Sequence, residues 1–277
     1  MGPFMLSAVT ICLVPEARQG PFVFHGAAAL AEGCRLAAEM GFDAVEIFPA
    51  SAAQLRGANV AGLLKAHGLR LAAVGTGAGW VKQQLNLVAP DAAGREAAQQ
   101  FIADIIDAAG ELGAPAIIGS MQGRWGGEVS RESAEDLLAD ALARLERRAA
   151  SHAQRLLYEP LNRYETNLFN RQADAAAFVR RRGLQHVRLL CDLFHMNIEE
   201  QDIGKSLREC GALVGHVHWA DSNRQAVGMG HTPMEPVIAA LQAIGYDGML
   251  SAEIFPLPTA AAAARHSILS IRSHTRA

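Results

Sequence analysis

The chain has 277 residues, of which 50% are hydrophobic and 19% charged, with a net charge of −3 and a pI near 6.4. This composition supports one sizeable buried core, and it lacks the basic excess of a nucleic-acid-binding surface. No apolar run reaches the roughly 18 residues of a membrane span. The N-terminus has no basic region before its apolar stretch, as a signal peptide would have. We therefore expect a cytoplasmic protein without a membrane or nucleic-acid partner.

One pattern repeats along the chain. A short run rich in Val, Ile and Leu ends in a polar or glycine-containing turn, and an Ala- and Leu-rich amphipathic helix follows. The runs are mostly continuous in apolar character, as in parallel strands covered on both faces. Eight strands are predicted in this way, at residues 5–13, 43–48, 69–75, 116–119, 155–159, 187–192, 215–219 and 248–254.

Eight strands that alternate with helices predict a parallel α/β fold. Because the chain is close to the roughly 250 residues of one barrel, we expect a single (β/α)8 TIM barrel domain over residues 1–277. An open doubly wound sheet would need a switch point, and no GxGxxG follows the first strand. The glycine-rich segment 75–79 lacks that nucleotide fingerprint.

Glycines and cysteines support this organisation. Six glycines follow helical stretches, where a left-handed cap is expected: Gly41, Gly68, Gly113, Gly183, Gly211 and Gly245. The four cysteines are scattered and form no CxxC pair, so we expect buried free thiols. They are Cys12, Cys34, Cys191 and Cys210.

Four consecutive predicted strands deliver a potential metal ligand at their carboxyl ends: Glu159, Asp192, His218 and Glu253. In a barrel these ends carry the working residues. Taken alone, Asp192 could cap a helix and His218 could be a satisfied core histidine. Together, carboxylates that point into one barrel mouth repel each other unless a cation neutralises them. Three carboxylates and one imidazole suit Mn²⁺, Mg²⁺ or Co²⁺.

The second half of the chain resembles the xylose isomerase-like barrel superfamily. Within it, the chain looks like the ketose 3-epimerases related to D-tagatose and D-psicose 3-epimerase, and like the 5-keto-L-gluconate epimerase branch. The intervals of 33, 26 and 35 residues between the proposed ligands fit that family. In one departure, Leu193 stands where the family often has Thr or Ser. Residues 44–47 and 117–124 carry a weaker likeness in the first half. The motifs lie at residues 159–165, 192–200, 218–224, 228–231 and 253–256.

The resemblance implies functions for seven residues of these motifs. The four strand-end residues would hold one divalent metal, Mn²⁺ before Mg²⁺ or Co²⁺. Glu159 and Glu253 would also be the catalytic acid/base pair, and Glu165, His195 and Arg224 would bind the sugar oxygens near C1 to C3. The expected reaction is epimerisation at C3 of a ketose or keto-sugar acid. The enzyme would be a homodimer or homotetramer that acts on a small keto-sugar.

Several alternatives remain open at this stage. The same metal site could serve an aldose–ketose isomerase of the hydroxypyruvate isomerase type or a dehydratase of an inositol derivative, although Glu165 favours an epimerase. An endonuclease that cleaves abasic DNA on this barrel would use several metals and a basic face. A non-catalytic sugar-binding barrel is a further possibility. Glu165 could merely brace its loop, and Arg224 could form a loop salt bridge. Glu46 and His231 could reach the barrel mouth, but the sequence assigns them no function.

Overall fold

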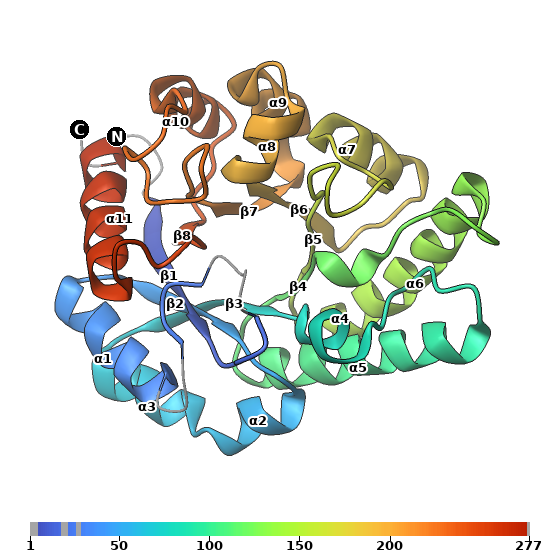
Figure 1. The fold of residues 1–277 in the computed structure, drawn as a ribbon, viewed down its shortest axis with the longest axis horizontal. Helices are drawn as coiled ribbons and strands as arrows, with labels where there is room; N and C mark the ends of the chain where they lie inside the picture. Colours follow the sequence, from blue (N-terminus) through green and yellow to red (C-terminus); the bar gives the residue numbers. More distant parts are fainter. Residues whose placement is uncertain (1–4, 18–21, 26–28, 276–277) are drawn as a thin grey trace.

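The structure is a computed structural model that describes residues 5–17, 22–25 and 29–275. Its centre is a closed barrel of eight parallel strands in sequential order (Figure 1). This confirms the predicted (β/α)8 fold. The strands are β1 (Leu6–Cys12), β2 (Ala44–Phe48), β3 (Arg70–Gly75), β4 (Ala116–Ile118), β5 (Leu156–Tyr158), β6 (Val187–Asp192), β7 (Val214–His218) and β8 (Met249–Ala252).

Helices surround the barrel, as Figure 1 shows. Two short 3₁₀ helices are present among the described residues. One, η1 (Ser120–Gln122), follows β4, and the other, η2 (Gly211–Leu213), precedes β7. The α-helices of the described residues are α1 (Ala29–Met40), α2 (Ala52–Gly57), α3 (Val60–His67), α4 (Ala78–Gln83), α5 (Ala92–Glu111), α6 (Arg131–Ser151), α7 (Gln172–Arg181), α8 (Leu193–Glu199), α9 (Ile203–Cys210), α10 (Met234–Ala243) and α11 (Ala260–Thr275).

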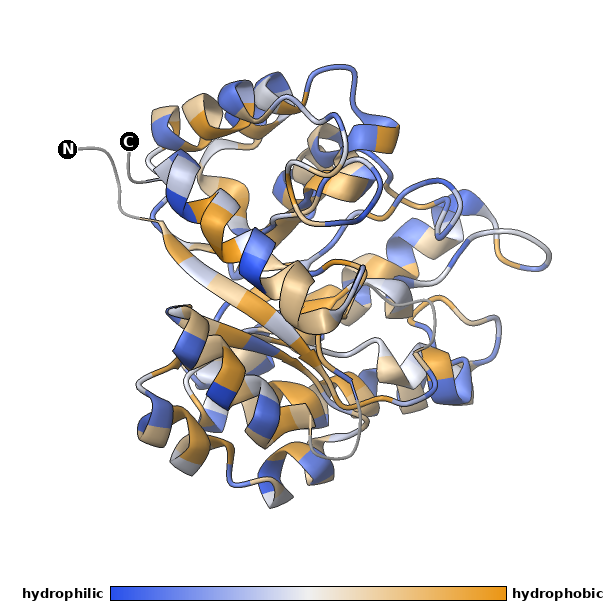
Figure 2. Cartoon of the chain, turned by 60° about the vertical axis from the view of Figure 1, so that its left-hand side comes forward, coloured by the Kyte–Doolittle hydropathy of each residue, from blue (hydrophilic) through white to orange (hydrophobic). Residues whose placement is uncertain are grey.

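Apolar residues fill two separate spaces. The main core lies between the strands and the helices, and Figure 2 shows hydrophobic colour along the strands, with both colours on the surrounding helices. Inside the barrel, a small cluster from four neighbouring strands contains Ala73, Ile117, Leu157 and Leu190. Because strand side chains alternate, residues two positions after Leu157 and Leu190 also point inward. This layer therefore supports Glu159 and Asp192 from below.

The predicted strands agree with the observed ones within two residues at each boundary. The largest difference is at β8, which ends at Ala252 rather than at residue 254. Ile254 is fully buried although it lies beyond the last paired residue of β8. Hydrophobicity therefore marks burial here rather than strand pairing.

The buried free thiols are confirmed, and the glycine caps are confirmed in having a positive φ, although Gly211, with a ψ of −127°, lies outside the left-handed helical region. All six glycines have a positive φ, between 57° at Gly211 and 85° at Gly41. The four cysteines are free and buried. Among the described residues, no helix is both long and apolar enough to cross a membrane.

Candidate active site

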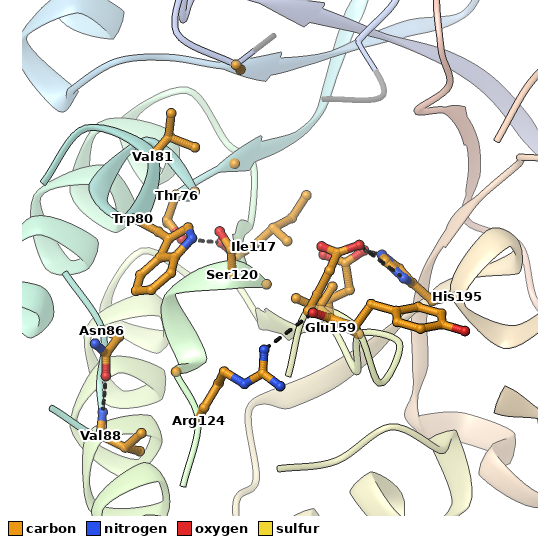
Figure 3. Close-up of a pocket in the computed structure, with 18 of the residues that line it drawn as sticks. Thr76, Trp80, Val81, Asn86, Val88, Ile117, Ser120, Arg124, Glu159 and His195 are labelled. Carbon is orange, nitrogen blue, oxygen red and sulfur yellow. Dashed lines mark hydrogen bonds and ion pairs between the residues drawn. The ribbon is translucent and has the colours of Figure 1, made fainter. Parts of the chain in front are cut away.

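A cavity of about 1040 Å³ opens at the carboxyl ends of the strands. Six of the seven residues proposed from the sequence line it, and the seventh, Asp192, is fully buried against its wall. In Figure 3, Trp80, Asn86 and Arg124 lie on one side of the space, and Glu159 and His195 lie on the other. The proposed site residues are thus brought together in one place.

The four proposed metal ligands converge at one edge of this cavity. Each offers one atom, and these four atoms all lie within 4.8 Å of one another. The Nδ1 atom of His218 is 3.1 Å from Oε2 of Glu253, 3.6 Å from Oε1 of Glu159 and 3.6 Å from Oδ2 of Asp192. Strand register contributes to this geometry, because Asp192 and His218 are direct partners on β6 and β7.

Asp192 is oriented by the helix that follows it. Its Oδ1 atom accepts a hydrogen bond of 2.8 Å from the backbone N–H of Phe194 and so caps α8. The other oxygen, Oδ2, is directed to the ligand cluster. Capping and metal binding are therefore compatible functions of one carboxylate. Leu193, the departure from the family pattern, is fully buried in the apolar core. The capping hydrogen bond comes from the backbone N–H of Phe194, so it does not depend on the side chain at position 193.

Glu159 lies one residue beyond β5 and is held by the end of β4. Its backbone N–H donates to the carbonyl of Ile118 at 2.9 Å, and its own carbonyl accepts from Nε2 of Gln122 at 2.9 Å. A Cβ atom on Gly119 would lie only 2.4 Å from Oε2 of Glu159, so the carboxylate could not keep this position beside a larger residue. Burial raises the pKa of Glu159 to about 7.

The buried cluster fits a cation. Three of its ligand atoms have no hydrogen-bond partner among the described residues, namely Oε1 of Glu159, Oδ2 of Asp192 and Nδ1 of His218. Buried polar atoms without partners are costly, and these three converge on one point. Carboxylate oxygens and an imidazole nitrogen are the ligands that suit Mn²⁺, Mg²⁺ and Co²⁺. The residues present therefore fit a single divalent metal.

His195 presents a proton to the cavity. Its Nδ1 atom accepts from the backbone N–H of Asn162 at 3.2 Å and lies 2.8 Å from the side-chain Nδ2 of the same residue. With Nδ1 acting as an acceptor, the proton of a neutral ring is on Nε2. Burial lowers the pKa of His195 to about 3, so the ring stays neutral. Its Nε2 has no hydrogen-bond partner, which leaves this donor for a ligand.

Arg224 connects the ligand cluster to Glu165. Its Nη2 atom is 3.1 Å from Oε2 of Glu253, and its Nη1 atom is 3.5 Å from Oε1 of Glu165. The guanidinium also lies over the ring of Phe194 at 4.7 Å from its centroid. Burial alone would lower the pKa of Arg224, but the charges of Asp192 and Glu253 outweigh it and raise the pKa. Arg224 therefore stays a cation beside the carboxylates.

The sequence did not assign a function to Glu46 and His216, two buried residues beside the ligand cluster. Glu46 of β2 lies 2.8 Å from Nε2 of His216 and 3.2 Å from Nε2 of His218. The β2 position of Glu46 and the alternation of His216 and His218 on β7 could have indicated an inward direction for all three. His231, in contrast, is exposed, does not line the cavity, and contacts Ser222 at 3.1 Å.

The wall opposite the ligand cluster contains glycines and aromatic rings together with polar residues. Phe48 ends β2, and its ring packs on the backbone of Gly75 and Gly77, where an added Cβ would meet it at 2.4 and 2.7 Å. Trp80 and Arg124 also line this wall. The glycine-rich segment noted in the sequence thus leaves room for an aromatic ring of the cavity wall.

Comparisons with known proteins agree with this geometry. A sequence model of the xylose isomerase-like TIM barrel family matches residues 34–274. The D-psicose 3-epimerase of Agrobacterium fabrum is 32% identical over 225 residues, which cover 79% of this chain and 76% of that protein. The 3-dehydro-D-guloside 4-epimerase of Escherichia coli is 37% identical over 112 residues, which cover only 40% of this chain and 43% of that protein.

A solved structure shows the same fold over the whole chain. It is the D-allulose 3-epimerase from Methylomonas sp. in complex with D-allulose, with a TM-score of 0.83 at 24% sequence identity. The match covers 99% of both chains.

Proposed function

This chain belongs to the xylose isomerase-like TIM barrel family and to its ketose 3-epimerase branch, and from this premise we propose that it is a metal-dependent epimerase acting at C3 of a ketose. It is an enzyme of the sugar epimerase type. The observation that carries the proposed chemistry is the convergence of three partnerless ligand atoms within the four-residue cluster. The substrate is a small keto-sugar, and the assembly is a homodimer or homotetramer.

The metal is one divalent cation, Mn²⁺ before Mg²⁺ or Co²⁺. Glu159, Asp192, His218 and Glu253 would hold it. When bound, it supplies a Lewis acid that stabilises the negative charge developing on the substrate oxygens as a proton leaves the neighbouring carbon. The predominance of carboxylate oxygens in the cluster supports this choice.

Glu159 and Glu253 are the proposed acid/base pair. Epimerisation needs a base on one face of C3 and an acid on the other, and these residues come from opposite ends of the series of strand-end ligands. One carboxylate removes the C3 proton, and the other returns a proton to the opposite face. Burial, which raises the pKa of Glu159 to about 7 without the metal, supports this function because it favours the protonated form.

His195, Arg224 and Glu165 are proposed to hold the substrate oxygens. The Nε2–H group of His195 and the guanidinium of Arg224 are donors at the cavity wall, and the Glu165 carboxylate accepts hydroxyl protons. Donors aimed at the ketone oxygen favour the charge that builds up there during proton removal. Arg224, fixed beside Glu253, would also keep that carboxylate oriented.

The test is a substrate panel. Purified protein loaded with Mn²⁺ is incubated with D-fructose, D-psicose, D-tagatose and L-ribulose, and the products are identified by NMR. We expect a change of configuration at C3. Exclusive conversion between ketose and aldose would instead favour the isomerase alternative, and no conversion of any sugar would contradict the proposal.

Epimerisation of a keto-sugar within a glycoside is a second candidate. The cavity, at about 1040 Å³, reaches the upper end of the roughly 300–1,000 Å³ typical of sites for drug-sized ligands, which are larger than a hexose. The relative from Escherichia coli is named as a 4-epimerase of such a glycoside. Adding a methyl glycoside of a keto-hexose to the panel distinguishes the two candidates, because only the second predicts a preference for it.

A further inference from the structure

A second cluster of buried polar residues lies next to the ligand cluster and shares His218 with it. Its other members are Glu46 from β2 and His216 from β7. The two histidine rings are T-shaped with centroids 5.5 Å apart, and both direct Nε2 toward the Glu46 carboxylate. Glu46, His216 and His218 are each at most 3% exposed.

Both carboxylate oxygens of Glu46 in this second cluster have polar partners, unlike three ligand atoms of the first cluster. The Oε2 atom of Glu46 lies 2.8 Å from Nε2 of His216. Its Oε1 atom accepts from the hydroxyl of Thr10 at 3.3 Å and lies 3.2 Å from Nε2 of His218. Neither oxygen of Glu46 is among the partnerless buried atoms. These contacts describe a hydrogen-bonded network rather than a second metal site.

The shared histidine makes this network relevant to the metal. His218 directs Nδ1 to the ligand cluster and Nε2 to Glu46. An imidazole can ligate only through a nitrogen that carries no proton, so the ring proton must be on Nε2. A carboxylate that accepts a hydrogen bond from the other nitrogen fixes this tautomer and the ring orientation, and it raises the basicity of the ligand.

We propose that Glu46 is the positioning residue that fixes His218 with its proton on Nε2 and its lone pair directed to the metal. The inference rests on the proposed metal site. His216 and Thr10 in turn hold the carboxylate, so a network from β1, β2 and β7 orients one ligand. Glu46 acts through His218 and does not need to touch the substrate.

The first test compares Mn²⁺ binding by wild-type protein and by Glu46→Gln, using titration calorimetry on the full chain freed of metal. The substitution keeps the size of the side chain but places an amide N–H₂ where one histidine needs an acceptor. Mn²⁺ affinity should fall about 10- to 100-fold, as for other groups that orient a ligand. Glu146→Gln is the control, because Glu146 is a buried carboxylate that accepts from the backbone N–H of His186 at 2.6 Å and does not line the cavity.

The second test separates positioning from simple loss of a negative charge. Protein with ¹⁵N-labelled histidine is loaded with Zn²⁺, which is diamagnetic, and long-range ¹H–¹⁵N NMR identifies the tautomer of His218. Wild-type protein should show a low-field proton on Nε2 and a metal-bound Nδ1. This spectrum needs only the wild-type chain, so it tests the proposal even if the variant does not fold.

The outcomes distinguish the two proposals. If wild-type protein binds neither metal at His218, the metal site is wrong and the inference about Glu46 falls with it. If wild-type protein binds Mn²⁺ and folded Glu46→Gln binds it equally well, only the inference is overturned. A Zn²⁺-bound Nε2 with the proton on Nδ1 would also overturn it. Weaker binding by Glu46→Gln together with the expected wild-type spectrum supports it.

Discussion

The two halves of the barrel mouth are made of different kinds of residue. Strands β5 to β8 end in carboxylates and an imidazole that converge within 4.8 Å. In the other half, the ends of β2 and β3 carry Phe48 and Gly75, and α4 adds Gly77 as its N-cap and Trp80 in its first turn. The first half supplies the groups that can bind a cation and move a proton, whereas the second supplies space and the aromatic rings of Phe48 and Trp80. The proposed ligands and the aromatic wall thus lie on opposite sides of one cavity.

The largest effect is expected for the proposed acid/base pair in the polar half. Glu159→Gln and Glu253→Gln keep the side-chain size but remove a base, so each should reduce kcat by at least about 10²-fold. Steady-state kinetics with the best ketose of the panel measures this. Wild-type turnover in either variant would show that proton transfer does not use that residue.

Gly119→Ala tests whether the close approach of the chain after β4 fixes the position of the Glu159 carboxylate. The added Cβ would lie 2.4 Å from Oε2 of Glu159 and would displace that carboxylate. Since a displacement of about 1 Å can cost roughly 10²-fold in rate, we expect a loss of that order in kcat. Gly57→Ala is the control, because a Cβ there meets nothing within 4 Å. Equal activity of both variants would contradict the proposed placement of Glu159.

His218→Ala should weaken Mn²⁺ binding by more than about tenfold, since it removes one of four ligands. Calorimetry on metal-free protein provides the measurement. His216→Ala is the informative comparison, because His216 lies two residues earlier on the same face of β7 but contacts Glu46 instead of the carboxylates of the ligand cluster. Loss of metal in His216→Ala alone would exchange the functions proposed for the two histidines.

The smallest effect is expected on the side of the aromatic wall. Trp80→Ala should raise KM about two- to tenfold with kcat nearly unchanged, as expected for the loss of aromatic contacts with a substrate. The control is Trp125→Ala, because Trp125 is 38% exposed and does not line the cavity. A large fall in kcat for Trp80→Ala would mean that this wall takes part in the chemistry.

The difference between the two halves of the barrel mouth also explains which site residues could be predicted from the sequence. Metal ligands are of a few residue types, and in a parallel barrel the working residues follow strands, so Glu159, Asp192, His218 and Glu253 could be proposed from residue type and strand-end position. Periodicity predicted the alternating strands and helices, and their number together with the chain length predicted the barrel. Gly75 and Gly77 could not be assigned in this way, because glycine is also common in turns and only the packed Phe48 ring reveals their function.

Glu46 shows a second limit of sequence analysis. An acidic residue inside a predicted strand indicates an inward-facing polar group, but its partners come from another strand some 170 residues away. The pairing of Glu46 with His216 and His218 depends on barrel closure and on the relative height of β2 and β7. Neither barrel closure nor this relative height can be inferred from the local sequence pattern.

The most direct test of the account is solvent deuterium incorporation at C3 of an active ketose. Wild-type enzyme loaded with Mn²⁺ is run in D₂O with each epimer, and C1 and C3 are followed by NMR. Proton transfer by two carboxylates predicts deuterium at C3 of the product, and it predicts that one Gln variant can still exchange the C3 proton of one epimer without forming product. Complete conversion by wild-type enzyme with no deuterium at C3 or C1, under conditions that exclude a shielded proton transfer, would contradict the account.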